Sequence, residues 1–99
     1  MEWLQEWYNK QCDGVWEHMY GVKIETLDNP GWKVEIDLSD TQYQELKKLN
    51  KNLEVEFEDT NWIICNMDNK KFYGCGDASK LGEILEIFQT WVQEIENLK

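Results

Sequence analysis

The chain has few prolines, histidines and basic residues and no long apolar segment, although common functional classes require one or another of these. Its 99 residues include one proline and one histidine, and no apolar run approaches the roughly 20 residues that a membrane-spanning helix needs. Ten basic residues oppose twenty carboxylates, so the formal net charge is −10. Nucleic acids and anionic membranes are bound through basic faces that displace counterions. We therefore expect neither a nucleic acid nor a membrane among the partners of this protein.

The start of the chain and its cysteines favour a reducing compartment. Residues 1–6 carry neither the basic segment nor the apolar segment of a secretory signal peptide. Three cysteines are an odd number, which suits free thiols better than a disulfide framework. We expect a cytoplasmic protein, and the length predicts a single domain over residues 1–99.

The first twenty residues predict one helix and one loop. Apolar side chains recur at helical spacing over residues 2–12, which predicts an amphipathic helix. Residues 13–20 show no clean period, so we predict an aromatic-rich loop that leads into the first strand.

Two strands and a hairpin are predicted next. Alternation of apolar and charged side chains indicates strands over residues 22–25 and 32–38. Residues 28–31 read Asp-Asn-Pro-Gly, where the proline presets φ and Gly31 supplies the positive φ of a type II turn. Residues 26–27 interrupt the alternation, which predicts a bulge just before the turn.

A short helix is predicted after the second strand. Ser39 and Gln42 have the spacing of a capping box, with Ser39 at the N-cap position. Tyr43, Leu46 and Leu49 then form one apolar stripe at helical spacing.

The second half of the chain predicts a meander and a long helix. Alternating segments over residues 53–58, 62–67 and 72–75 are separated by turn residues. A wide apolar stripe then predicts a helix from a cap at Asp77 or Ser79 to the end of the chain.

This order of elements predicts an α+β fold. Hairpins dominate, so we expect an antiparallel sheet of about five strands with the N-terminal and C-terminal helices packed on one face. The other face stays uncovered and carries eight charged side chains, six of them negative. These are Lys23, Glu25, Lys33, Glu35, Asp37, Glu54, Glu56 and Glu58.

Candidate catalytic groups are few. His18 is the one histidine that could activate a nucleophile, and Cys12, Cys65 and Cys75 form no CxxC pair and no zinc-binding spacing. None of the thiols lies in a segment rich in positive charge, which would lower its pKa. We expect no catalytic site, no metal and no cofactor. A small enzyme that uses His18, Glu17 and one cysteine is the alternative.

Two pairs of adjacent polar residues could form a further binding or catalytic site. Glu17 and His18 would meet Asp28 and Asn29 if the aromatic loop folded over the hairpin turn, which would give a binding pocket or an acid–base pair. The other interpretation is that these side chains hydrogen-bond their own turns. The segment Gly74–Asp77 lacks the lysine of a phosphate-binding loop, so we do not predict one.

Several segments resemble the Immunity protein 53 family. The opening run Trp3–Tyr8, followed by Trp16-Glu17-His18, is similar to the start of that family. The stretch Thr26–Trp32 is its most recognisable part, and weaker similarity continues through Trp62–Cys65 and Phe72–Asp77 into the last helix. The resemblance covers nearly the whole chain.

The resemblance implies an α+β protein of a bacterial polymorphic toxin system, which binds a cognate toxin domain in the cytoplasm and silences it. The motif residues carry no implied catalytic role, so each of them either holds the fold or touches the toxin. They are Trp16, Glu17, His18, Asp28, Asn29, Pro30, Gly31 and Trp32. Some relatives carry a sulfurtransferase-like name, which this sequence does not support because no cysteine lies in a loop suited to a persulfide.

We therefore expect a non-enzymatic inhibitor that occludes the active site of a basic toxin, such as a nuclease, through an acidic and aromatic surface. Trp32 or Trp62 would supply an aromatic anchor. The charge would come from Glu35, Asp37, Glu54, Glu56 and Glu58. A structural interaction domain without a toxin partner is a further alternative, and the sequence leaves the oligomeric state open.

Overall fold

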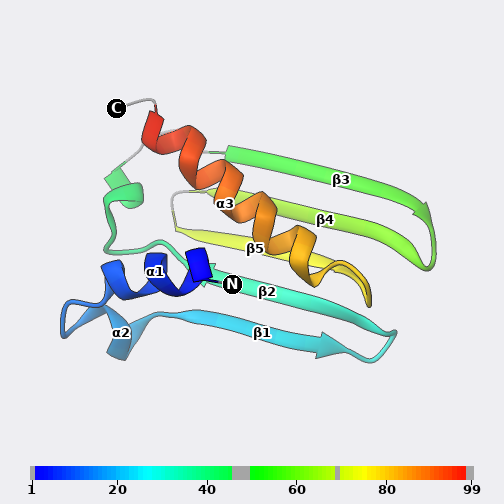
Figure 1. Cartoon of the computed structure of the whole chain (residues 1–99), viewed down its shortest axis with the longest axis horizontal. Coiled ribbons are helices and arrows are strands. Elements are labelled where there is room, and N and C mark those ends of the chain that lie inside the picture. The colour runs from blue at the N-terminus through cyan, green and yellow to red at the C-terminus, as the bar shows by residue number, and fades with distance from the viewer. Residues whose placement is uncertain (1, 46–49, 69, 98–99) are drawn as a thin grey trace.

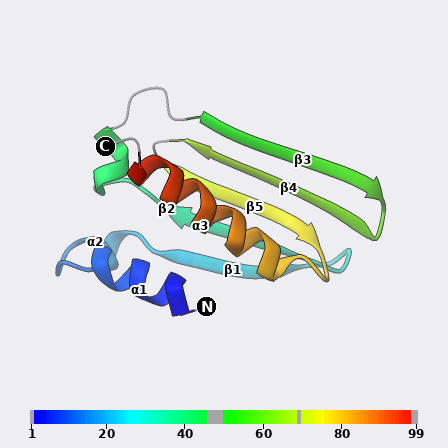
Figure 2. The ribbon, with the colours of Figure 1, turned by 45° about the horizontal axis from the view of Figure 1, so that its top comes forward.

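The computed structural model describes residues 2–45, 50–68 and 70–97 (Figures 1 and 2). The helices are α1 (Glu2–Gln11), α2 (Trp16–Met19) and α3 (Leu81–Asn97), with a 3₁₀ helix η1 (Gln42–Glu45). The strands are β1 (Val22–Leu27), β2 (Gly31–Asp37), β3 (Asn50–Glu58), β4 (Asn61–Asp68) and β5 (Lys71–Asp77). No helix within these residues is long and apolar enough to cross a membrane.

The strands form one antiparallel sheet in the order β1-β2-β5-β4-β3. The predicted meander is therefore present, and β5 lies at the centre because it pairs with β2 as well as with β4. Helices α1 and α3 lie on the same face, with α3 crossing β4 and β5 (Figure 1). The structure confirms the predicted α+β fold with both terminal helices on one face of an antiparallel sheet.

The core lies between the sheet and the two helices, and aromatic rings fill much of it. The Phe88 ring of α3 lies 5.0 Å from that of Trp7 and 5.0 Å from that of Phe72, measured between centroids. The indole N–H of Trp7 donates to the Tyr43 hydroxyl at 3.2 Å, which donates to a Glu96 carboxylate oxygen at 2.9 Å. Large rings suit a chain this short because each buries about 150–250 Å².

The close approach of α3 to the sheet depends on Gly74 in β5. A Cβ atom at this position would overlap Cγ2 of Ile84 and would lie 3.3 Å from Phe72 Cε2 and 3.4 Å from Cys65 Sγ. Optimal carbon–carbon contacts are about 3.5–4.0 Å, so a larger residue would push α3 away from the sheet.

The hairpin turn differs from the sequence prediction. Strands β1 and β2 pair without interruption from Val22 opposite Ile36 to Leu27 opposite Gly31, so the predicted bulge before the turn is wrong. Gly31 has no positive φ and belongs to β2, so the type II turn is also wrong. Glycine is required there for a different reason, because a Cβ would lie 2.6 Å from the carbonyl oxygen of Gly76 in β5.

Part of the predicted aromatic loop is helical. Oδ1 of Asp13 accepts the backbone N–H groups of Val15 and Trp16, both at 2.9 Å. The Glu17 carboxylate accepts those of Asp13 at 3.0 Å and Gly14 at 2.9 Å. The Asp13 carboxylate thus satisfies the N–H of the first residue of α2, and the Glu17 carboxylate holds the turn that leads into the helix.

The helical turn after β2 begins at a different residue from the one predicted. The Thr41 hydroxyl accepts the Tyr43 N–H at 3.2 Å and donates to the Leu38 carbonyl oxygen at 2.5 Å. Thr41 therefore occupies the capping position that we assigned to Ser39. The observed element is η1, and the predicted stripe residues at 46 and 49 lie outside the described residues.

Candidate functional site

The sheet face opposite α1 and α3, which we call the outer face, carries most of the predicted charges. Strand register also places Lys71, Tyr73 and Cys75 of β5 and Trp62 and Ile64 of β4 on this face. The outer face is therefore less acidic than predicted, because the two central strands contribute a lysine, two aromatic rings and an aliphatic side chain. Of these residues only Trp62 was predicted to lie on the binding surface, because the sequence does not show that β5 pairs with β2.

The acidic residues of β2 are paired with lysines. Lys33 Nζ lies 3.1 Å from Glu35 Oε1, and Lys71 Nζ lies 3.9 Å from Glu35 Oε2 and 3.7 Å from Asp37 Oδ1. The hydrogen bond from Lys33 lowers the pKa of Glu35. The side chains of Glu35 and Asp37 are 19% and 24% exposed. These two predicted toxin contacts therefore offer little unbalanced charge.

The acidic residues of β3 are different. Glu54, Glu56 and Glu58, which we call the acidic edge, are exposed on the strand that ends the sheet. None of the three forms an ion pair with another described residue, and Glu58 accepts the Thr60 hydroxyl at 3.3 Å. A register shift between Glu56 and Glu58 marks a bulge there. The acidic edge supplies the unbalanced negative charge of the predicted binding residues.

The two predicted aromatic anchors lie on opposite faces of the sheet. Trp62 is partly exposed on the outer face, directly across the strand pair from Glu56. Trp32 packs against the core on the helix-covered face, and its indole N–H donates to the Ala78 carbonyl oxygen at 3.0 Å. Trp62 therefore shares a face with Glu54 and Glu56 of the acidic edge, and Trp32 does not.

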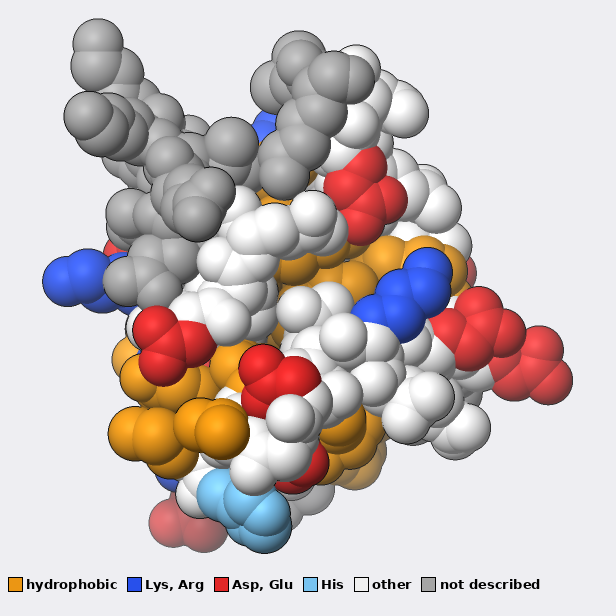
Figure 3. All heavy atoms as spheres, turned by 90° about the vertical axis from the view of Figure 1, so that its left-hand side faces the viewer, with side chains coloured by type: hydrophobic (Ala, Val, Ile, Leu, Met, Phe, Trp, Pro, Cys, Tyr) orange, Lys and Arg blue, Asp and Glu red, His pale blue; other side chains and the backbone are white. Residues whose placement is uncertain are grey.

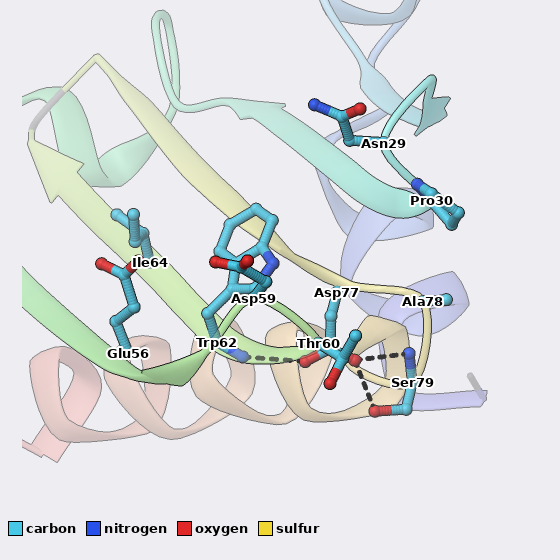
Figure 4. A pocket seen from close by; sticks show the side chains of 10 residues that line it. All are labelled: Asn29, Pro30, Glu56, Asp59, Thr60, Trp62, Ile64, Asp77, Ala78 and Ser79. Carbon is cyan, nitrogen blue, oxygen red and sulfur yellow. Dashed lines mark hydrogen bonds between the residues drawn. The ribbon is translucent and has the colours of Figure 1, made fainter.

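A hollow of about 840 Å³ opens at one end of the outer face. The hairpin turn, the β3–β4 turn and the segment before α3 meet there. In Figure 4 the Trp62 side chain lies between Glu56 and Ile64 on one side and the hairpin residues on the other. The lining residues are Asn29, Pro30, Glu56, Asp59, Thr60, Trp62, Ile64, Asp77, Ala78 and Ser79.

The buried carboxylate of Asp77 fixes this end of the sheet. Its Oδ2 accepts the Trp62 backbone N–H at 2.9 Å and lies 2.9 Å from Lys80 Nζ, which also donates to Asn61 Oδ1 at 2.9 Å. Its Oδ1 accepts the Ser79 N–H at 2.8 Å and the Ser79 hydroxyl at 2.6 Å. The hydrogen bonds from Ser79 and Lys80 hold the pKa of Asp77 well below its usual range. Asp77 therefore caps the turn that precedes α3 and fixes the backbone of Trp62, whereas α3 itself begins at Leu81, later than a helix cap at Asp77 or Ser79 would place it.

Comparison with known proteins identifies the family. The chain matches the Immunity protein 53 family over residues 1–93. It belongs to that family. No curated protein and no solved structure matches it. Membership in the Immunity protein 53 family indicates a toxin-neutralising role with a toxin as partner, and immunity proteins are generally not enzymes.

Two of the first three Immunity protein 53 motif residues, Trp16 and Glu17, support the fold. Trp16 is buried, and its indole N–H donates to the Ser39 carbonyl oxygen at 3.0 Å. The Glu17 carboxylate accepts the backbone N–H groups of Asp13 and Gly14 in the turn that precedes α2. His18 is exposed at the same end of the molecule.

The second group lies at the other end of the hairpin. Asp28 is exposed in the turn, Asn29 and Pro30 line the hollow, and Gly31 makes the close contact with β5. The six residues of β1 separate this turn from α2 by roughly 20 Å (Figure 1). The possible cluster of Glu17-His18 with Asp28-Asn29 therefore does not form, and Glu17 instead hydrogen-bonds its own turn.

The thiols show no sign of activation. Cys65 is buried between the sheet and α3, and burial raises its pKa to about 12. Burial also raises the pKa of Cys75, which lies on the outer face. The Cys12 thiol donates to the Tyr8 carbonyl oxygen at 3.3 Å. A thiolate is the reactive form, so these environments do not favour the alternative of a cysteine enzyme. No group suited to hold a metal ion occurs among the residues described.

A second exposed surface lies at the α1–α2 end (Figure 3). Val15, Met19 and Tyr8 are 60%, 66% and 38% exposed. They lie near an apolar hollow of about 370 Å³, which is lined by Leu4, Gln5, Tyr8, Tyr20, Gly21 and Val22. The sequence does not indicate this surface, because residues 13–20 show no periodicity that separates exposed from buried side chains.

Proposed function

We propose that this Immunity protein 53 member neutralises its toxin by binding it through the acidic edge and the adjoining hollow, and so occludes the toxin's active site. The observation that carries the proposal is the unbalanced charge of Glu54, Glu56 and Glu58 beside the partly exposed Trp62. Exposed aromatic rings next to charge are typical of energetically important interface residues. Acting as one domain in the cytoplasm, the chain would need no catalysis for this role.

The proposed toxin is basic and acts on nucleic acid. A nuclease needs a basic groove for the phosphate backbone, and an acidic edge can occupy such a groove in place of the substrate. The net charge of −10 adds long-range attraction. Electrostatic steering of this kind raises association rate constants toward about 10⁸–10⁹ M⁻¹s⁻¹ at low salt.

The test compares two charge reversals of equal size. Glu54→Lys/Glu56→Lys changes the acidic edge, whereas Glu83→Lys/Glu86→Lys changes two exposed residues of α3 on the opposite side of the sheet. Each variant is produced together with the toxin domain encoded by the gene directly upstream, and cell survival and complex formation are measured. We expect the first pair to abolish protection and the second pair to preserve it.

Other results would contradict the proposal in distinct ways. Equal loss in both variants would show that net charge matters and that the acidic edge does not. Full protection by Glu54→Lys/Glu56→Lys would place the interface elsewhere, and the apolar surface around Met19 would be examined next. Failure of the unmodified protein to bind that toxin domain would refute neutralisation by binding.

A further inference from the structure

We propose that the hollow on the outer face receives a single arginine side chain of the toxin. This inference rests on the proposed function, because it assigns the chemistry of the partner at the same surface. The hollow, at about 840 Å³, is larger than one side chain requires, so it also admits the backbone that presents the arginine.

The apolar part of the hollow suits a planar cation. Trp62 and Ile64 come from the outer face of β4, and Pro30 and Ala78 come from the turns that close the end of the sheet. The Trp62 backbone N–H donates to the buried Asp77 carboxylate at 2.9 Å, which fixes the point on β4 from which the indole projects. A guanidinium group stacks favourably on an indole face, and the arginine stem packs on aliphatic surface.

Two carboxylates that line the hollow form no ion pair with another described residue. Asp77 is matched by Lys80, so the remaining charges among the lining residues are those of Glu56 and Asp59. Both side chains are exposed, and neither forms an ion pair with another described residue. Glu56 lies directly across from Trp62, which places the two Cβ atoms about 5 Å apart. A guanidinium over the indole would therefore be within reach of a carboxylate.

Arginine fits this arrangement better than lysine does. Its guanidinium is planar, offers several N–H donors to carboxylates and is less strongly hydrated than an ammonium group. The occupant also cannot come from a second copy of this protein, because all ten basic residues of the chain are lysines. The arginine must therefore come from another protein, which in the proposed function is the toxin.

The first test compares two neutralising double variants. Glu56→Gln/Asp59→Asn removes the two free carboxylates that line the hollow, whereas Glu54→Gln/Glu58→Gln removes two neighbouring carboxylates that do not line it. Both variants change the net charge by the same amount. For binding to the upstream-encoded toxin domain, we expect the first variant to raise the dissociation rate at least about tenfold and the second by less than about threefold.

The second test needs no toxin. N-acetyl-arginine amide is titrated into ¹⁵N-labelled protein, and N-acetyl-citrulline amide serves as the uncharged isostere. We expect saturable shifts of the Trp62 backbone and indole N–H resonances with the arginine probe alone. These shifts should disappear in Glu56→Gln/Asp59→Asn and persist in Glu54→Gln/Glu58→Gln.

The outcomes separate this inference from the proposed function. Equal dissociation rates for the two variants, or equal shifts with both probes, would overturn the arginine site. If both variants weaken toxin binding equally, the acidic edge still binds the toxin and only the arginine site is lost. If neither variant affects toxin binding, both proposals fail, even where the probe binds.

Discussion

Replacing Gly74 by alanine tests whether the absence of a side chain in β5 sets the distance between α3 and the sheet. The added Cβ would overlap Cγ2 of Ile84, which is fully buried in the first turns of α3. The helix must then shift, or Ile84 must leave its preferred rotamer.

Two opposing effects determine how much Gly74→Ala changes the free energy of unfolding. Overpacking a well-packed core costs about 1–3 kcal/mol. Replacing glycine by alanine also restricts the unfolded chain, which returns about 0.4–1 kcal/mol. We expect Gly74→Ala to lower the free energy of unfolding by about 1–2 kcal/mol, which for a chain of this size lowers Tm by roughly 4–16 °C.

Ile84→Leu provides the complementary change, because leucine keeps the volume of isoleucine but has no Cγ2 branch at Cβ. Alone it should cost less than about 1.5 kcal/mol. In Gly74→Ala/Ile84→Leu the overlap is removed, so the double variant should be more stable than the sum of the single effects by about 1 kcal/mol. Urea unfolding followed by tryptophan fluorescence measures all four proteins.

Gly82→Ala is the matched control. Gly82 lies in α3 with open space where its Cβ would stand, so alanine should stabilise the protein by about 0.5–1 kcal/mol. Two results would show that the overlap with Ile84 does not set the position of α3. One is a Gly74→Ala protein as stable as the unmodified protein, and the other is a double variant whose loss equals the sum of those of Gly74→Ala and Ile84→Leu.

Four further predictions concern the site. Because hydrogen bonds lower the pKa of Asp77 in the folded protein, its ionised carboxylate adds to the free energy of unfolding. This stabilisation is fully present above the unfolded pKa of about 4 and is lost progressively as the pH falls toward the folded pKa. Asp77→Asn should therefore lower Tm more at pH 7 than near pH 2, and an equal loss at both pH values would refute this. Raising the salt concentration from ~50 to ~500 mM should slow toxin association roughly tenfold, because the Debye length falls well below about 10 Å, and stopped-flow rates that do not change would refute steering. Cys65 should resist iodoacetamide at pH 8 in the folded protein and react in urea, as measured by mass spectrometry, because it is buried and its pKa is raised to about 12. His18→Ala/Cys12→Ala should still protect cells from the toxin, whereas the alternative of a cysteine enzyme predicts loss of protection.

Most of the fold could be predicted because each element carries its own periodic signal. The alternation in β2 and the wide apolar stripe of α3 gave their locations directly. The wrong predictions concern turns and caps, where the same local sequence is compatible with more than one backbone conformation. Pro30 and Gly31 suggested a type II turn, but the contact of Gly31 with β5 accounts for that glycine, and no local signal reports a contact with a strand more than forty residues away.

The candidate site was only partly predictable for the same reason. Glu56, Glu58 and Trp62 were named from the sequence as binding residues. Sequence spacing could not show that lysines neutralise Glu35 and Asp37 or that Trp32 lies on the covered face. Asp59 and Ile64 were not named as binding residues. They flank Trp62 within the β3–β4 pair, but the hollow that they line forms only where the β1–β2 turn and the segment before α3 meet that pair.

The sequence by itself determined the kinds of element, the excess of negative charge and the supply of large rings for a small core, because these depend on composition and on periods of two and 3.6 residues. Tertiary structure alone decided which charges remain unpaired. Pairing β5 with β2 brings Lys71 to Asp37 and leaves the acidic edge on β3 without a cation among the described residues. Charge balance on a sheet depends on which strands are neighbours, and that order is set by packing across the whole core.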